Sequence, residues 1–217
     1  MTFILTLALS SLLALSVATW SQEAVVPNAA VDLAQADDPA AGDRPRLIQV
    51  GDMAPDFAVS TLNGQPVTLS DLRGKVVVLS FWFRPCDACV YDLQSTQAFS
   101  DWLDSQEDVP IVSLVMDEYS SWVNQADRDG EVPVDRRAST RAYLARKDIT
   151  MDVLVDPRGL PVRTAYGVTA YPTRVIIDPD GRVVSVSTGS RGQRLLDILK
   201  SESLAAWHTW QARELQK

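Results

Sequence analysis

The two cysteines of this 217-residue chain are separated by two residues, in the stretch Cys86-Asp87-Ala88-Cys89. On a helix, a spacing of three brings both sulfur atoms to the same side, and a helix N-terminus stabilises a thiolate. A thiolate at Cys86 can attack a disulfide, and Cys89 can then resolve the mixed disulfide. A bridge that closes so small a ring constrains little of the unfolded chain, so a structural role explains it poorly. The spacing therefore predicts a reactive dithiol, with two inert buried cysteines as the alternative.

The rest of the composition excludes several other kinds of site. The chain has a single histidine, His208, so the Cys and His ligands that would complete a zinc site are missing, and a histidine-based triad is disfavoured. The formal net charge of −8 argues against nucleic-acid binding through a positive field. We therefore expect no metal, no cofactor and no nucleic-acid partner.

Residues 1–20 predict a targeting segment. Phe3 to Ala18 is almost wholly apolar, and no charged residue appears before Glu23. The run is slightly short for a membrane span of about 20 residues, and the small residues Ser16 and Ala18 suit a cleavage site. A signal peptide is the favoured interpretation, and an uncleaved anchor that would tether the protein to a membrane is the alternative. Both predict a periplasmic or otherwise extracytoplasmic location, secreted or membrane-anchored, where disulfides persist.

The remaining chain divides into a linker and a folded domain. Residues 21–46 are rich in Ala, Asp and Pro and predict a flexible linker, whereas residues 47–217 show strand and helix patterns. Residues 76–83 form a continuous apolar run typical of a central strand, and helical spacing follows from Asp87 to about Gln106. Further strands are expected at 57–59, 67–69, 111–116, 153–155, 173–177 and 183–187, with a closing helix over 191–215. This order predicts an α/β fold with a mixed central sheet flanked by helices, and it places Cys86 at a strand-to-helix junction.

Several stretches resemble the exported, membrane-associated thioredoxins of the TlpA/ResA type, and the opening stretch also occurs in peroxiredoxins. The stretches are Val50-Gly51-Asp52-Met53-Ala54-Pro55-Asp56-Phe57, residues 69–79, Phe81-Trp82, Tyr166-Gly167-Val168, Tyr171-Pro172-Thr173 and residues 177–181. The resemblance covers about Val50 to Lys200. It implies a thioredoxin-like fold with an N-terminal β-hairpin, and the segment from Asp117 to Asp152 then reads as an enlarged central insertion.

The resemblance also implies roles for individual residues. Cys86 is similar to the family's nucleophile and Cys89 to its resolving thiol. Pro172 matches a cis-proline that lies beside the disulfide and docks the substrate chain together with Tyr171. Glu118 matches an acidic residue near the active cysteines, where a carboxylate could take up and deliver the proton of Cys89. The alternative for Glu118 is a glutamate at a helix start that faces water.

The sequence departs from the family pattern near the cysteines, where Asp87-Ala88 also replaces a proline-containing pair between them. Ser80 stands where ordinary thioredoxins carry a buried aspartate, so that proton relay is missing. Pro85, preceded by Arg84, stands where the family usually has tryptophan, which changes the surface that a partner would touch. The residues expected to contact a substrate chain are Trp82, Pro85, Tyr171 and Pro172.

These observations favour an exported thiol–disulfide oxidoreductase that reduces or exchanges disulfides in exported proteins and works with a redox partner protein. Cytochrome c maturation is one such task that the resemblance implies. A peroxiredoxin-like peroxidase is disfavoured because it needs Thr or Ser three residues before its reactive cysteine, and Phe83 precedes Cys86 at that spacing. A copper-binding assembly factor would need His208 near the cysteines, and His208 falls in the last helix pattern. A redox-inactive interaction module is a further alternative.

The stretch from Arg136 to Lys147 is basic within an acidic chain. A solvated helix face is the favoured interpretation. A docking surface for an acidic partner is the alternative.

Overall fold

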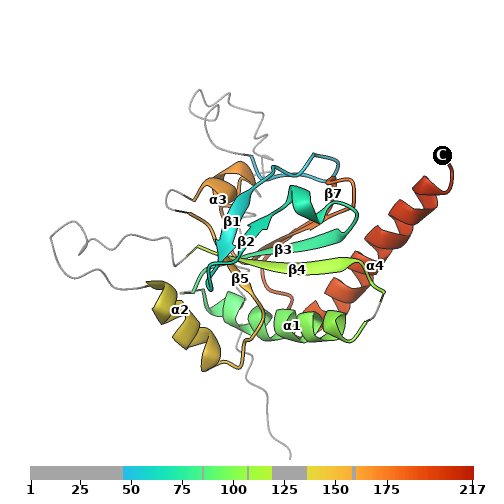
Figure 1. Ribbon diagram of the computed structural model, residues 1–217. Coiled ribbons are helices and arrows are strands. Elements are labelled where there is room, and N and C mark those ends of the chain that lie inside the picture. The colour runs from blue at the N-terminus through green and yellow to red at the C-terminus, as the bar shows by residue number, and fades with distance from the viewer. Residues whose placement is uncertain (1–45, 85, 107, 119–135, 158–159) are drawn as a thin grey trace, which may run out of the picture. The chain divides into compact units, whose positions relative to one another are not determined.

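A seven-stranded mixed sheet forms the centre of the structure, a computed structural model that describes residues 46–84, 86–106, 108–118, 136–157 and 160–217. The strands are β1 (Ala58–Thr61), β2 (Pro66–Thr68), β3 (Val76–Trp82), β4 (Ile111–Asp117), β5 (Val153–Val155), β6 (Thr173–Ile177) and β7 (Val183–Thr188). They lie in the order β2-β1-β5-β4-β3-β6-β7, with β3, β4 and β5 parallel to one another (Figure 1). The predicted signal segment and nearly all of the predicted linker lie outside the described residues.

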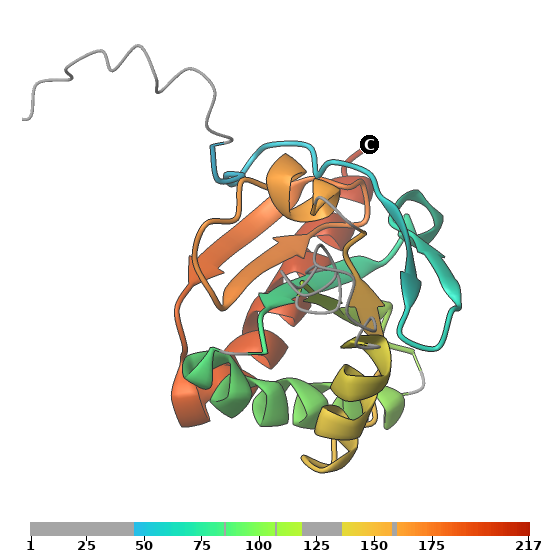
Figure 2. The same ribbon diagram turned by 90° about the vertical axis from the view of Figure 1, so that its left-hand side faces the viewer.

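Helices cover both faces of the sheet. They are α1 (Asp87–Asp104), α2 (Arg136–Ala145), α3 (Pro161–Ala165) and α4 (Leu195–Glu214), with 3-10 turns at Ser70–Leu72 and Gly192–Arg194. Alternation along β3 decides which residues meet which helix. Val76 and Val78 pack against Phe99 of α1 and Leu199 of α4, whereas Phe81 packs with the segment of α3 on the other face. Figure 2 shows α3 on one side of the sheet and α1 and α4 on the other.

The central strand β3 is covered on both faces of the sheet. All seven residues of β3 are buried, as the apolar run predicted. The hairpin between β1 and β2 is also confirmed, with Gly64 at a φ of 85° in its turn, a conformation that glycine adopts at little cost. The α/β architecture with a mixed sheet is therefore confirmed.

The structure defines two helices, α2 and α3, whose bounds the sequence pattern did not give. The pattern gave no helix at α3, which begins with Pro161 at its first turn and receives its cap from a distance. The carboxylate of Asp156 accepts hydrogen bonds from the backbone N–H groups of Val162 and Arg163, at 3.1 and 2.8 Å. Helix α2 forms from residues within the basic stretch, between β4 and β5. Within the described residues, no helix is both long enough and apolar enough to cross a membrane.

The register of the strands brings the predicted site residues to one edge of the sheet. Trp82 at the end of β3 lies beside Asp117 at the end of β4, and Phe81 lies beside Thr173 at the start of β6. The segments that follow β3 and β4 and the segment that precedes β6 therefore meet at this edge. They carry Cys86, Glu118 and Pro172.

Candidate active site

The Cys86–Cys89 disulfide lies at the junction between β3 and α1. Cys86 is the N-cap residue of α1, and its sulfur accepts a hydrogen bond from the backbone N–H of Cys89 at 3.1 Å. The two Cα atoms are 5.2 Å apart. Cys86 is half-buried whereas Cys89 is only 1% exposed. Because the N-terminal end of a helix stabilises negative charge, the accessible Cys86 is suited to be the attacking thiolate and the covered Cys89 the resolving thiol.

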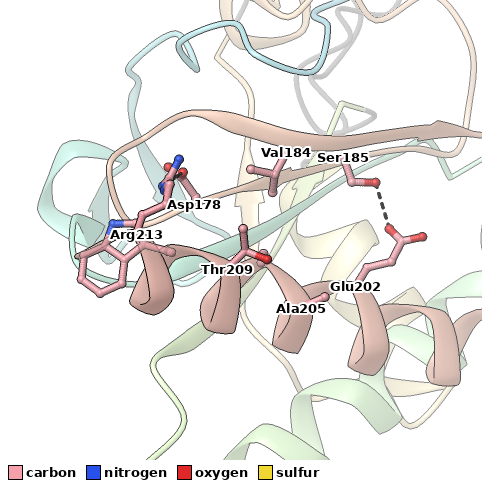
Figure 3. Close-up of a pocket in the computed structure, with 9 residues that line it drawn as sticks. Asp178, Val184, Ser185, Glu202, Ala205, Thr209 and Arg213 are labelled. Carbon is pink, nitrogen blue, oxygen red and sulfur yellow. Dashed lines mark hydrogen bonds and ion pairs between the residues drawn. The ribbon is translucent and has the colours of Figure 1, made fainter. Parts of the chain in front are cut away.

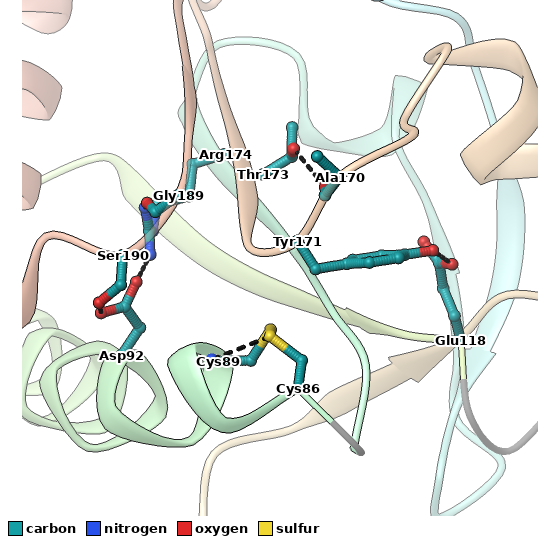
Figure 4. Close-up of a disulfide and its surroundings, with 10 residues drawn as sticks. All are labelled: Cys86, Cys89, Asp92, Glu118, Ala170, Tyr171, Thr173, Arg174, Gly189 and Ser190. Atoms are coloured by element: carbon teal, nitrogen blue, oxygen red, sulfur yellow. Dashed lines mark hydrogen bonds and ion pairs between the residues drawn. A yellow bond between two sulfur atoms is a disulfide. The ribbon is translucent and has the colours of Figure 1, made fainter.

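The loop before β6 lies against this disulfide. The Tyr171–Pro172 peptide bond is cis, as predicted. Pro172 is buried and lines the same small void as Cys89. Tyr171 is half-buried, and its ring stacks on Phe83 with the ring centroids 5.8 Å apart. Figure 4 shows the Tyr171 side chain extending from this loop, beside the disulfide, toward Glu118.

Glu118 is buried at the end of β4 and contacts the cis-proline loop. Its side chain is fully buried, which excludes the interpretation as a glutamate that faces water. The hydroxyl of Tyr171 donates a hydrogen bond to Oε2, and the Nε of Arg163 lies 3.6 Å from the same oxygen. Oε1 has no hydrogen-bond partner among the described residues. Burial raises the pKa of Glu118 to about 8, against the opposing charge of Arg163, so the carboxyl group is largely protonated at neutral pH.

These contacts define what Glu118 can do chemically. Its described contacts go to Tyr171 and Arg163, so the carboxyl group touches the cis-proline loop and no sulfur atom. A proton on Glu118 can therefore reach the disulfide only through an intermediary such as the hydroxyl of Tyr171 or water. The structure brings Glu118 into the site through Tyr171.

The sequence analysis missed a buried ion pair beneath the disulfide. Asp92 of α1 and Arg174 of β6 are each 3% exposed and form an ion pair (Figure 4). Asp92 also accepts a hydrogen bond from the hydroxyl of Ser190 at 2.5 Å, and Arg174 donates to the carbonyl of Gly189 at 3.2 Å. Asp92 and Arg174 line a void of about 10 Å³ together with Cys89. The cluster therefore ties α1, β6 and the segment after β7 together directly behind the resolving cysteine.

Two signals in the sequence could have found this pair. Asp92 lies three residues after Cys89 and four before Thr96, and all three are buried on one face of α1. Arg174 interrupts β6, which is otherwise free of charge and buried along its whole length. A charge at a position that must be buried needs a partner of opposite sign.

Ser80 faces the same cluster from β3. It pairs directly with Arg174 across the β3–β6 ladder and lines the void with Cys89. Its hydroxyl oxygen is buried and has no hydrogen-bond partner among the described residues. At the position where ordinary thioredoxins carry an acid, this chain therefore places a neutral hydroxyl, and the buried acid comes from α1 instead.

Of the other residues expected to contact a substrate chain, only Trp82 lies among the described residues. Trp82 is only 2% exposed and stacks on Tyr143 of α2, with the ring centroids 6.3 Å apart. The guanidinium of Arg84 lies 5.0 Å from the centroid of the same tyrosine ring and donates to the hydroxyl of Ser139 at 2.6 Å. Trp82 thus lies behind the disulfide and not on the surface that a partner would contact. Pro85 lies outside the described residues.

The basic stretch is mostly a solvated helix. Arg137, Arg146 and Lys147 are exposed. Arg141 donates a hydrogen bond to the carbonyl of Leu62 at 2.9 Å, which anchors α2 near the β1–β2 hairpin. A docking role for this stretch stays a prediction.

The residues that the alternative functions need are placed elsewhere. His208 is exposed on α4, where its Nδ1 lies 3.3 Å from Oε1 of Gln211. This part of α4 lies near the Asp178 end of β6, through the ion pair with Arg213, whereas Pro172 precedes the other end. The described residues contain no cluster of three or more His, Cys, Asp or Glu side chains that could hold a metal ion. Phe83, at the position where a peroxidase needs a hydroxyl, is stacked on an aromatic ring.

A cavity of about 430 Å³ lies between β7 and α4, away from the disulfide (Figure 3). Val184, Ala205 and Trp210 line it, and the Asp178–Arg213 ion pair closes one end. None of the residues that line it belongs to the site at the other edge of the sheet.

The comparisons with known proteins agree with this geometry. The sequence profile of the AhpC/TSA family matches residues 50–186. The thioredoxin-like protein YneN of Bacillus subtilis (strain 168) is 26% identical over 150 residues, which is 69% of this chain and 78% of that protein. The thiol-disulfide oxidoreductase ResA of Bacillus thuringiensis subsp. konkukian is 26% identical over 151 residues, covering 69% and 76% of the two chains.

Solved structures show the same fold. A crystal structure from Chlorobium tepidum, assigned as a thiol:disulfide interchange protein DsbE, aligns with a TM-score of 0.58 and 26% identity over 73% of this chain and 98% of that one. StoA from Bacillus subtilis aligns with a TM-score of 0.53 and 18% identity over 68% and 96% of the two chains, which supports the fold alone. The profile match spans more than half of the chain and includes the Cys86–Cys89 disulfide at its strand-to-helix junction. The chain therefore belongs to the AhpC/TSA family, in which it is a thiol–disulfide oxidoreductase with a thioredoxin fold.

Proposed function

We propose that the protein is exported and uses the Cys86–Cys89 dithiol to reduce or exchange disulfides in other exported proteins. The observation that carries the proposal is the asymmetry of the pair. Cys86 is half-buried at the N-terminus of α1, whereas Cys89 is covered beside a cis-proline loop. An enzyme that exchanges disulfides with large substrates needs one sulfur within reach and a second that is protected until the mixed disulfide has formed.

In the reducing direction the reaction proceeds in two steps. The thiolate of Cys86 attacks one sulfur of the substrate disulfide, so that a mixed disulfide forms and one substrate thiolate leaves. Cys89 then loses its proton and attacks the sulfur of Cys86, which forms the Cys86–Cys89 disulfide and releases the second substrate thiolate. Two electrons pass from the dithiol to the substrate, and a redox partner protein must return them before the next cycle.

The Tyr171–Pro172 loop is proposed as the surface on which the substrate chain docks. The support is its place beside the disulfide and the half-exposed ring of Tyr171. Glu118 acts in this proposal as a positioning residue, because it holds the hydroxyl of Tyr171 from behind. Its proton, held at a pKa of about 8 by burial, is available to the loop near neutral pH.

The extracytoplasmic location rests on residues 1–20, whose apolar run and small residues are typical of a signal peptide. Fusion of residues 1–46 to a reporter enzyme that becomes active only after export tests it. We expect activity outside the cytoplasm with the native segment. Activity that is unchanged when charged residues replace Leu9, Leu12 and Leu13 would contradict export through this segment.

Trapping of mixed disulfides tests the proposed activity. A Cys89→Ser variant can form the mixed disulfide but cannot resolve it, so we expect it to accumulate covalent adducts that a reductant releases. The matched control is Cys86→Ser, which lacks the accessible attacking sulfur and should accumulate few adducts. Equal trapping by the two variants, or none by either after reducing and oxidising pretreatment, would contradict the proposal.

The reduction potential of the pair separates the two directions of electron flow. A value near about −270 mV would mark a reductant and one near about −120 mV an oxidant. Equilibration of the protein with glutathione redox buffers, with the thiol content as the readout, measures this value.

A further inference from the structure

A small void behind Cys89 is lined by two charged side chains that have no part in the two-step reaction. Its volume is about 10 Å³, and its lining includes Ser80, Cys89, Asp92, Pro172 and Arg174. Cys89, Asp92 and Arg174 are all at least 97% buried. A charge in such a place interacts strongly with its neighbours, because little solvent screens it.

Two charged groups line this void, and two others act on Arg174 from outside it. Asp92 comes from α1 and Arg174 from β6, and they are in contact. Arg191, from the segment after β7, repels the charge of Arg174, and Glu202 of α4 supports it. β3 contributes Ser80, Phe81 and Trp82 to the lining, none of which carries a charge. Burial, and then Arg191, lower the pKa of Arg174 to about 10, so its guanidinium is still positively charged at neutral pH.

The negative charge of Asp92 lies close to Cys89 and opposes formation of its thiolate, whereas the positive charge of Arg174 favours it. Asp92 follows Cys89 by three residues on α1, so the two side chains are neighbours on one face of the helix. A carboxylate beside a thiol disfavours the thiolate, and the resolving step needs the thiolate of Cys89. The guanidinium of Arg174 lies at the same void, with its own position fixed by Asp92 and the carbonyl of Gly189.

We propose that Arg174 is a positioning residue for the resolving step, because its buried positive charge offsets Asp92 and stabilises the thiolate of Cys89. It acts through the field at Cys89 and takes no part in bond formation. The inference rests on the proposed function for its consequence, since a thiolate at Cys89 matters only if Cys89 resolves a mixed disulfide. The charge effect itself can be measured without any substrate.

The experiment titrates Cys89 in a Cys86→Ser background, where it is the sole cysteine of the chain. The ultraviolet absorbance of the thiolate is followed against pH in the full-length protein. Replacement of Arg174 by Gln is expected to raise the titration midpoint by about one pH unit or more, the size of effect that a nearby charge has on a buried group. Arg174→Lys keeps the charge and should restore a midpoint close to that of the parent.

Asp92→Asn is expected to shift the midpoint in the opposite direction, to lower pH, since Arg174 then acts without an opposing carboxylate. The matched control is Arg213→Gln, which breaks the ion pair with Asp178 at the far end of β6, on the edge of the cavity between β7 and α4 (Figure 3). That variant should leave the midpoint unchanged. Near-ultraviolet circular dichroism of the six tryptophans shows whether each variant is folded at the start of the titration.

Two results would overturn the inference. One is a midpoint for Arg174→Gln that coincides with that of Arg213→Gln, and the other is a rise of the midpoint in Asp92→Asn. Failure of the proposed function has a different signature, because trapping by Cys89→Ser would then be absent while these midpoints still shift.

Discussion

Asp92 and Glu118 are two buried carboxyl groups on either side of the active-site loop, and they differ in how closely a cation approaches them. Asp92 is in contact with Arg174, which is itself buried, and accepts a further bond from Ser190. Glu118 has its nearest guanidinium 3.6 Å away on Arg163, whose side chain is one-third exposed, and one of its oxygens has no partner among the described residues. Burial pushes a carboxyl group toward its protonated form, whereas a close cation and hydrogen-bond donors stabilise the carboxylate. The site therefore holds one fixed charge pair and one carboxyl group that titrates near neutral pH.

Removal of the cation from the fixed pair should have the largest effect on stability. Arg174→Met leaves Asp92 buried without its partner, and breaking a buried pair in this way costs about 3–5 kcal/mol. The free energy of unfolding, from urea denaturation of the oxidised protein, measures the loss. The double variant Asp92→Leu with Arg174→Met removes both charges and should recover most of it. Arg213 is half-exposed and serves as the control. A loss for Arg174→Met no larger than that for Arg213→Met would show that the buried pair stabilises the fold no more than the half-exposed one.

The titrating carboxyl group predicts a pH dependence. The folded-state pKa of Glu118 is about 8 and its ordinary value is 4.5, because burial favours the protonated form. Between these values the folded state binds a proton that the unfolded state has lost, so stability falls as pH rises. The contribution is fully present below pH 4.5 and is lost as pH approaches 8. We expect the wild type to lose on the order of 2–4 kcal/mol more than Glu118→Gln across this range, since one pKa unit corresponds to about 1.4 kcal/mol.

Thermal or urea unfolding of both proteins at several pH values measures this difference. Other titrating groups contribute equally to the two proteins, so the difference isolates Glu118. Parallel stability curves for the wild type and the variant would show that Glu118 keeps an ordinary pKa in the folded protein.

The sequence predicts well which strand, helix and loop hold this site, because these elements depend on local patterns. The apolar run of residues 76–83 identifies the central strand, and the spacing of Cys86 and Cys89 identifies the start of α1. The cis-proline at Pro172 was expected from the family resemblance and is confirmed. Each of these features rests on residues that are close together in the chain or on a short motif.

The charge arrangement is harder to predict, because it depends on contacts between distant segments. Asp92 and Arg174 are separated by 82 positions in the chain, so each segment can indicate a buried charge but neither indicates which partner that charge meets. Glu118 was expected beside the cysteines on the family resemblance, whereas its described contacts are with Tyr171 and Arg163. Only the register that places the end of β4 and the start of β6 on either side of β3 decides between these arrangements.

The hydrogen bond between Tyr171 and Glu118 should have an intermediate effect. Tyr171→Phe keeps the ring that stacks on Phe83 and removes only the donor, so we expect a loss of about 1–1.5 kcal/mol in the free energy of unfolding. A double-mutant cycle with Glu118→Leu, which removes the acceptor, shows whether the loss comes from this bond. The control is Tyr143→Phe, which removes a hydroxyl from a ring stacked on Trp82. Equal losses in the two phenylalanine variants would contradict a specific role for the bond.

Two serines beside the fixed pair give the smallest and most direct contrast. The hydroxyl of Ser190 donates to Asp92 at 2.5 Å, whereas the buried hydroxyl of Ser80 has no partner among the described residues. Ser190→Ala should therefore cost about 1 kcal/mol, and Ser80→Ala should change the free energy of unfolding by less than about 0.5 kcal/mol. A cost for Ser80→Ala equal to that for Ser190→Ala would mean that Ser80 is bonded in solution, and the void of about 10 Å³ beside it is close to the size that one water molecule occupies. Because Ser80 faces Arg174 across the ladder, such a water would extend the polar contacts of the pair toward β3 and bring Ser80 into the group that surrounds Cys89.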